Sequence, residues 1–206
     1  MKKKLFVILV LVVMSTGLYA QQAGTHTVGF RIGAAFGMWS GLESRSGPHG
    51  TGWINIEESD RLNFNIVGYY AYTFRDNFSL QIEFNYMINQ GIDIERNHSG
   101  PGMSWHRETE FTHTSLDIPI LLRYNFLWGF LGVLVGPHVS IPLIGDYVDD
   151  LNVTFGITVG GQGFFPLGNG FLVGDVRFIA DFNEIVDGSD WHRQALVISV
   201  GYEWSF

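Results

Sequence analysis

The 206-residue sequence contains no cysteine, and this absence narrows the chemistry open to it. Disulfides and thiolate metal sites are excluded, so neither can organise the fold. Lysine is confined to positions 2–4. Without these three, the 12 basic residues reduce to nine arginines against 20 acidic residues, and the formal net charge falls from −8 to −11. A chain of this charge offers no basic patch, and we expect no nucleic-acid partner.

Long apolar runs are also missing, apart from a short one between Leu5 and Met14. A helix that spans a bilayer needs roughly 20 apolar residues. Because this run follows basic residues and precedes Ala20, it has the anatomy of a secretory signal peptide, and a retained anchor is the less favoured alternative. We predict a signal peptide over 1–20, cleaved after Ala20, and one domain over 21–206.

What the chain does have is glycine (26 residues), aromatics (15%) and several segments in which apolar and polar side chains alternate. The clearest case is 62–89, where two alternating runs are joined by a short polar turn at 75–77. In a soluble sandwich the apolar face would be buried, whereas so long an aromatic face suits a membrane. The pattern predicts a β-hairpin whose apolar face contacts lipid.

The last stretch, 194–206, alternates in the same way and ends in Tyr202, Trp204 and Phe206 on one face. It resembles the terminal signal of bacterial outer-membrane barrels, which typically end in a strand with a final Phe. In water these rings would be an aggregation hazard at an open sheet edge. The resemblance implies recognition of this strand by the barrel-assembly machinery.

Eight alternating segments are predicted as strands, at 27–39, 62–74, 78–89, 111–126, 130–143, 153–165, 171–182 and 194–206. Their connections are in turn long and short, with long polar loops at 40–61, 91–109, 144–152 and 183–192. Pro119 within the fourth segment implies a bulge or local unpairing, because it cannot donate to the ladder. An even number of strands with alternating connections predicts an all-β, eight-stranded antiparallel transmembrane β-barrel, an up-and-down meander of the bacterial outer membrane.

Motifs in the later strands resemble the PorT-like outer-membrane β-barrels, within the broader group of OmpA-like barrels. They are 116–124 (LDIPILLRY), 155–156 with 160–163 (FG and GGQG), 175–178 (DVRF) and 183–185 (NEI). Phe178 stands where the family usually has Tyr. The resemblance implies an eight-stranded barrel in the outer membrane, from a family in which one branch serves protein secretion, and it implies no catalytic residues.

Ionisable residues occur on the face of the strands that alternation places inside the barrel. We expect them to pair in the lumen, because an eight-stranded barrel is just filled by its side chains and an unpaired buried charge is costly. A gated pathway in which the arginines exchange carboxylate partners is the alternative. The predicted lumen charge network comprises Arg31, Glu83, Asp117, Arg123, Asp175, Arg177, Asp181 and Glu203.

Outward aromatic residues cluster beside the short turns and at the last strand. Such residues form girdles at the two interfaces of a membrane barrel. In a soluble lipocalin-like barrel the same residues would be core. The predicted membrane-interface aromatics are Tyr70, Tyr72, Phe74, Phe78, Tyr124, Phe126, Trp128, Tyr202, Trp204 and Phe206.

Two patterns hint at further chemistry. His138 and Ser140 with Asp150 vaguely resemble the triad of outer-membrane lipid A deacylases, but alternation directs the first two into the lumen, away from lipid. The histidines and carboxylates of 91–109, namely Asp93, Glu95, His98, His106 and Glu108, match no tight metal motif. We therefore expect no catalysis, metal or cofactor, and read the acidic loops as soluble tips rather than cation bridges to anionic lipid.

The predicted function is a structural or interaction role in the outer membrane through the long extracellular loops. Outer-membrane lipid and an extracellular or envelope protein are the expected partners. A narrow pore for small solutes is the first alternative, and a lipid A-modifying hydrolase is the second.

Overall fold

The computed structural model describes residues 23–40, 53–57, 62–100, 103–145, 151–185 and 192–206. The predicted signal peptide lies outside these residues. The strands are β1 (His26–Ser40), β2 (Trp53–Glu57), β3 (Leu62–Arg75), β4 (Phe78–Gly100), β5 (Met103–Phe126), β6 (Leu131–Gly145), β7 (Thr154–Leu167), β8 (Gly170–Asp181) and β9 (His192–Ser205). A single 3-10 turn, η1 (Leu127–Gly129), joins β5 to β6 within the described chain.

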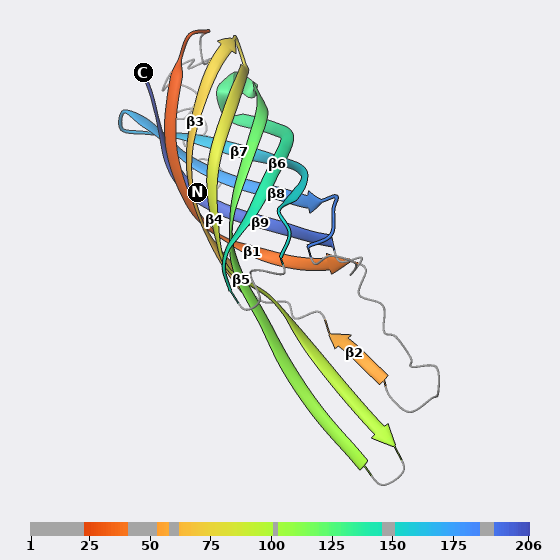
Figure 1. Cartoon of the computed structure of the whole chain (residues 1–206). Helices are drawn as coiled ribbons and strands as arrows, with labels where there is room; N and C mark the ends of the chain where they lie inside the picture. The colour runs from red at the N-terminus through yellow and green to blue at the C-terminus, as the bar shows by residue number, and fades with distance from the viewer. Residues whose placement is uncertain (1–22, 41–52, 58–61, 101–102, 146–150, 186–191) are drawn as a thin grey trace, which may run out of the picture.

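Eight of these strands close a barrel, as predicted (Figure 1). Each pairs antiparallel with its sequence neighbour, and β1 also pairs with β9, so the meander has no open edge in the wall. His26 and Phe206 exchange backbone hydrogen bonds of 3.0 and 2.8 Å at the end of this seam. Closing the sheet gives the backbone N–H and C=O groups of the wall hydrogen-bond partners, which lipid cannot supply.

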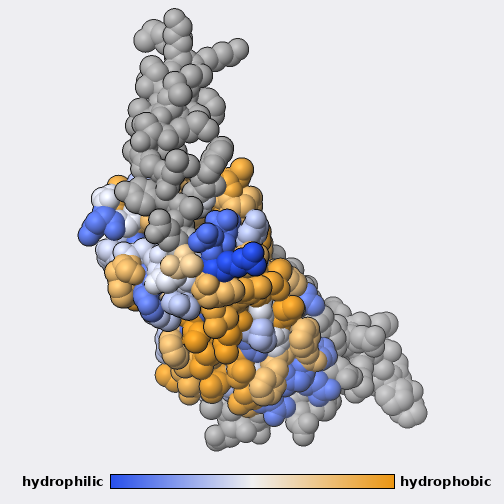
Figure 2. All heavy atoms as spheres, turned by 90° about the horizontal axis from the view of Figure 1, so that it is seen from above, coloured by the Kyte–Doolittle hydropathy of each residue, from blue (hydrophilic) through white to orange (hydrophobic). Residues whose placement is uncertain are grey.

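Alternation sorts the side chains of the wall between its two sides. On β3, Asn63, Asn65 and Val67 are buried while Phe64 and Ile66 are more than half exposed. Figure 2 shows apolar residues gathered in a broad area of the wall, bordered by hydrophilic ones. A polar inside and an apolar outside are the reverse of a soluble barrel, and this inversion is typical of transmembrane β-barrels.

The prediction of a loop over 91–109 is wrong. There β4 and β5 continue as a paired hairpin, with Asp93 opposite Glu110 and Gly100 opposite Met103 (Figure 1). The β-branched residues Ile92 and Ile94 favour a strand, and the Ser-Gly-Pro-Gly sequence at 99–102 favours a turn between the two arms. Polar composition therefore marked the turn but not the length of the arms.

The loop predicted over 40–61 is also interrupted. Strand β2 lies in it and pairs with the extended part of β4, from Trp53 opposite Asn97 to Glu57 opposite Asp93. Apolar residues at alternate positions, Ile54 and Ile56, are the signal that the glycines and carboxylates around them obscured. The hairpin and β2 together form a small three-stranded sheet beyond the barrel wall.

Irregularities in the ladder are local. Around Pro119 the ladder between β4 and β5 is interrupted from Ile82–Ile120 to Asn85–Asp117 without a change of register, so there is local unpairing on this side and no bulge. On its other side Pro119 stays paired with His138 of β6. The register does shift between Met87 and Gln90, where Asn89 has a positive φ of 57°. Because this bulge precedes the extended hairpin, it lies where β4 leaves the wall.

Candidate functional site: the lumen of the barrel

Six of the predicted lumen residues form one cluster, the inner network, made of Arg31, Glu83, Arg123, Asp175, Arg177 and Glu203. Glu83 is its centre, because it accepts hydrogen bonds from Arg31 Nη2 and Arg177 Nη2, both over 2.8 Å. Arg177 Nε also donates to Asp175 Oδ1 over 2.7 Å. Three guanidinium groups and three carboxylates balance in charge, which is what allows them to be buried together.

The rest of the inner network links two further strands to this centre. Arg123 Nη1 lies 3.2 Å from Glu203 Oε2, and Tyr69 donates its hydroxyl proton to the same oxygen over 2.9 Å. Gln81 receives a hydrogen bond of 3.1 Å from Arg123 and donates to Glu83. Arg123 and Glu203 are thereby joined to Glu83 by one hydrogen-bonded chain.

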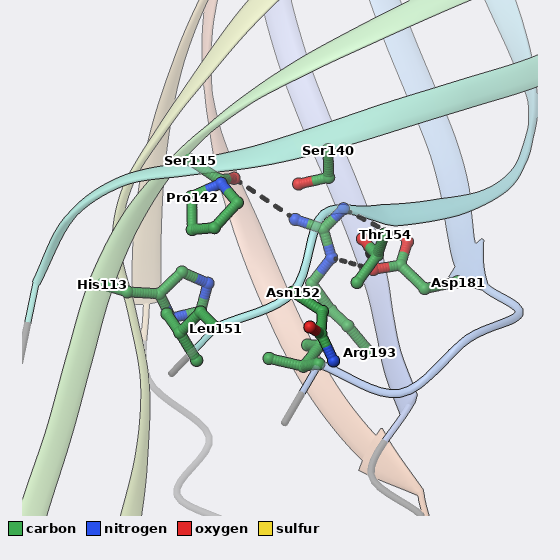
Figure 3. Close-up of a pocket in the computed structure, with 10 residues that line it drawn as sticks. His113, Ser115, Ser140, Pro142, Leu151, Asn152, Thr154, Asp181 and Arg193 are labelled. Atoms are coloured by element: carbon green, nitrogen blue, oxygen red, sulfur yellow. Dashed lines mark hydrogen bonds and ion pairs between the residues drawn. The ribbon is translucent and has the colours of Figure 1, made fainter. Parts of the chain in front are cut away.

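The other two predicted charges, Asp117 and Asp181, belong to a second cluster, the outer network, at the end of the lumen nearer the hairpin. Arg193 is its hub (Figure 3). Its Nε and Nη2 donate to the two oxygens of Asp181 over 3.0 and 3.2 Å, and its Nη1 donates to Asp117 over 3.2 Å and to Gln90 over 2.9 Å. A single guanidinium thus ties β9 to β8, β5 and β4.

A small cavity of about 10 Å³ lies beside Arg193 (Figure 3). His113, Ser140 and Thr154 line it together with apolar residues that include Leu151 and Ile185. Leu151 and Ile185 are buried, and the backbone N–H of Asn152 donates to the carbonyl of Ile185 over 2.7 Å. The volume suffices for about one water molecule, so a solute has no room there.

The structure places all eight predicted lumen charges inside the barrel, each no more than 5% exposed. The sequence reasoning missed Arg193, which is 2% exposed, because the terminal strand was predicted to begin at 194 rather than at His192. Its odd number, shared with the inward Ala195 and Val197, was the available signal. Extending the alternation by one residue would have found it.

Two residues of the suggested lipid A deacylase triad, His138 and Ser140, belong to the described part of the chain, and His138 contacts residues outside that triad. His138 Nε2 lies 2.7 Å from Asp181 Oδ1, and its Nδ1 lies 3.2 Å from Thr158 Oγ1. His138 and Ser140 are buried in the lumen, and Asp150 lies outside the described residues. His138 instead joins the outer network through its contact with Asp181. Its inward position alone did not predict this contact.

The histidines and carboxylates of the predicted second loop lie on the two arms of the hairpin. The register places Glu95 opposite Glu108 and His106 opposite Asn97. Within the described residues, no group of three or more histidines and carboxylates could hold a metal ion.

The predicted interface aromatics lie around the short-turn end of the barrel. Phe78 contacts Phe74 and Tyr124, with ring centroids 6.3 and 4.8 Å apart. His26 connects this group to the chain end, because its ring lies 5.1 Å from that of Tyr72 and 6.0 Å from that of Phe206. Six of the ten are exposed, Phe78, Phe126 and Tyr202 are partly buried, and the side chain of Trp128 is not among those described.

A closed eight-stranded meander with an apolar wall, aromatics at one end and a charged, filled interior is an outer-membrane β-barrel. A family model described as "Outer membrane protein beta-barrel domain" matches residues 19–154. The chain belongs to this family. No helix of the described chain has the length and apolar character needed to cross a membrane.

Solved structures show the same fold. The outer membrane protein OprG from Pseudomonas aeruginosa is similar with a TM-score of 0.51 and 11% identity, over 90% of this chain and 97% of that one. AlkL, determined by solid-state NMR in DMPC bilayers, is similar with a TM-score of 0.50 and 16% identity, over 90% and 91%. No curated protein matches the sequence. At these identities the likeness concerns the fold alone.

Proposed function

We propose that this outer-membrane barrel serves in interactions through the sheet formed by β2, β4 and β5, and that it neither conducts solutes nor catalyses a reaction. The hairpin is the observation that carries the proposal. Pairing of β5 with β6 ends at His113, whereas its pairing with β4 continues to Met103. The barrel does not need these extra residues to close its wall, so their retention favours a role outside it.

The filled lumen supports the second half of the proposal. Arg31, Arg123, Glu83 and Glu203 are fully buried. The two cavities described within the lumen measure about 10 Å³ each, far from a continuous aqueous path. A narrow pore would require the ion pairs of both networks to separate, at a cost of several kcal/mol for each unpaired buried charge.

The subfamily, the route of export and the orientation in the membrane stay predictions. Membership in the PorT-like branch rests on the motifs of 116–124, 155–163, 175–178 and 183–185, and it would make a protein-secretion component one candidate partner. Export through a cleaved signal peptide and recognition of 194–206 by the barrel-assembly machinery rest on the sequence. Short turns face the periplasm in bacterial barrels, and this orientation would place the hairpin outside the cell.

Photo-cross-linking in intact cells tests the interaction role. A photoreactive residue replaces Arg107 on the hairpin or, as the control, Leu172 on the lipid-facing wall. We expect a protein adduct of defined mass from position 107 and only lipid adducts from position 172. Conductance of the purified barrel in planar bilayers, with no adduct at position 107, would instead favour the pore.

A further inference from the structure

A second small cavity lies inside the lumen, beside the inner network. It measures about 10 Å³, and side chains of β1, β3, β4, β8 and β9 line it. Such a volume accommodates about one water-sized sphere, so it limits any guest to the size of a single water molecule. The lining is mixed in polarity and comprises Arg31, Asn65, Val67, Asn85, Asp175, Arg177, Ile179, Val197 and Ser199.

Two of the lining residues carry buried polar atoms that have no hydrogen-bond partner among the described residues. These atoms are Nε and Nη1 of Arg31 and Oδ1 of Asn65, on residues that are 0 and 2% exposed. A buried polar group without a partner is costly, and nearly all such groups in folded proteins bind either the protein or an ordered water molecule. The two side chains therefore point to a guest in the cavity that they line.

Neighbouring groups determine which atom of the Asn65 amide is available to this guest. Nδ2 donates a hydrogen bond to Asn85 Oδ1 over 3.1 Å, so the amide nitrogen already has its partner. A Cβ atom added to Gly33 would lie 2.7 Å from Asn65 Oδ1 and 2.5 Å from Ser199 Cβ. Because Ser199 also lines the cavity, Asn65 Oδ1 lies close to it as an acceptor that needs a donor.

Arg31 and Asp175 are close together, but their nearest atoms are too far apart for a direct hydrogen bond. Arg31 Nη1 lies 3.7 Å from Asp175 Oδ2, whereas Nη2 of the same guanidinium group donates to Glu83 over 2.8 Å. A polar separation beyond hydrogen-bond range is a position at which a water molecule bridges two groups. The same guest can therefore serve Arg31 and Asp175 as well as Asn65.

The polar groups at the cavity are of two kinds, and this determines the chemistry of the guest. The guanidinium group of Arg31 only donates hydrogen bonds, whereas Asn65 Oδ1 and the carboxylate of Asp175 only accept them. A metal cation could not accept a hydrogen bond from Arg31, and a halide ion could not donate one to either oxygen. Water both donates and accepts, and it matches the volume.

We propose that the lumen binds one internal water molecule, held by Arg31, Asn65 and Asp175, as a part of the folded barrel. The inference is independent of the role proposed above for the hairpin sheet. This water completes the hydrogen bonds of Arg31 on the side away from Glu83. Because the lumen around it is filled, the water exchanges with solvent only when the packing of the interior opens.

Transfer of magnetisation from water to methyl groups tests the proposal. The mature protein is labelled at its isoleucine and valine methyl groups, deuterated elsewhere and placed in lipid nanodiscs. NOE and ROE transfer from the water signal is then measured at Ile179 and Val197, which line the cavity. We expect transfer at both residues, with NOE and ROE of opposite sign, because the bound water tumbles with the protein.

Filling the cavity separates the bound water from exchangeable protons of nearby side chains. Val67→Ile enlarges a side chain that lines the cavity and leaves every hydrogen-bonding group in place. We expect the transfer to Ile179 and Val197 to be lost in this variant. Val135→Ile is the matched control, because it makes the same change at an outward position that is 43% exposed, and it should preserve the transfer.

Either of two results would overturn the proposal. Absence of transfer in the unaltered protein would mean that no water molecule resides in the cavity. Transfer that persists in Val67→Ile would originate from exchangeable protons such as that of the Ser199 hydroxyl. Heat-modifiable gel migration checks folding, and Ser199→Thr, which adds a methyl group beside the cavity and keeps the hydroxyl, replaces Val67→Ile if that variant does not fold.

Discussion

Glu83 is the residue on which the inner network converges, and its removal gives the sharpest prediction at this scale. Glu83→Gln keeps the shape but leaves Arg31 and Arg177 with one carboxylate fewer. Because both guanidinium groups stay buried, we expect the free energy of unfolding to fall by about 3 kcal/mol or more. Urea titration of the barrel in vesicles measures it.

The control for this prediction is a substitution on the other side of the wall. Val135→Ile alters an outward residue that is 43% exposed and should change the stability by no more than about 0.5 kcal/mol. Equal stability of Glu83→Gln and the unaltered protein would mean that the network contributes little beyond filling space.

Two strand glycines make a second prediction, because an added side chain has room at one position and not at the other. A side chain at Gly201 would meet the backbone oxygen of Phe30 and the side chain of Arg31, whereas Gly68 has nothing within 4 Å. We expect Gly201→Ala to lose about 1–3 kcal/mol of stability through overpacking. Gly68→Ala should fold normally, and the same urea titration compares them. Comparable losses at both positions would contradict the steric explanation.

Among the elements, the extended hairpin of β4 and β5 lies beyond the wall, and we expect the barrel to close without it. Its residues beyond Gln90 and His113 pair with each other and with β2, not with the other wall strands. Replacing 91–112 by Asn-Gly, a sequence suited to a two-residue hairpin turn, should leave a folded barrel. Unboiled protein on a gel should then still migrate apart from boiled protein. Loss of this difference would show that the sheet outside the wall is needed for folding.

A strand could be predicted accurately from the sequence where its two faces contact different surroundings. In β3, lipid on one side and lumen on the other select strictly alternating residues, and the bounds were predicted to within one residue. The hairpin arms outside the wall have no such contrast. Their alternation is therefore weaker, and polar residues such as Glu95 and Arg96 were taken for a loop.

The lumen residues could also be predicted from alternation, but their contacts with one another could not. Alternation directed Arg177 and Asp175 inward, but it could not tell which of several carboxylates each arginine would contact. Arg177 and Glu83 are 94 positions apart, and only the curvature and stagger of the closed barrel bring them together.

At the scale of the whole molecule, closure depends on the seam between β1 and β9. Deletion of 204–206 would remove Phe206, which exchanges two backbone hydrogen bonds with His26, and the pairs of Trp204 and Ser205 with β1. We expect the shortened chain to lack the heat-dependent shift in gel migration and to be digested by added protease. A matched substitution, Phe206→Tyr, keeps the backbone and the ring and should behave as the unaltered protein. A folded, protease-resistant truncated barrel would contradict the role given to the seam.

The long reach of the lumen contacts also sets the order of events during assembly. Tyr69 and Glu203 are 134 positions apart, and Arg193 and Gln90 are 103 apart, so these bonds form only when the last strand is in place. Before that moment, Arg123 lacks Glu203, and Asp117 and Asp181 lack Arg193. An incomplete sheet therefore carries unpaired lumen charges in addition to the unpaired backbone groups at its edges. Both terms favour the completed barrel over a partly formed one.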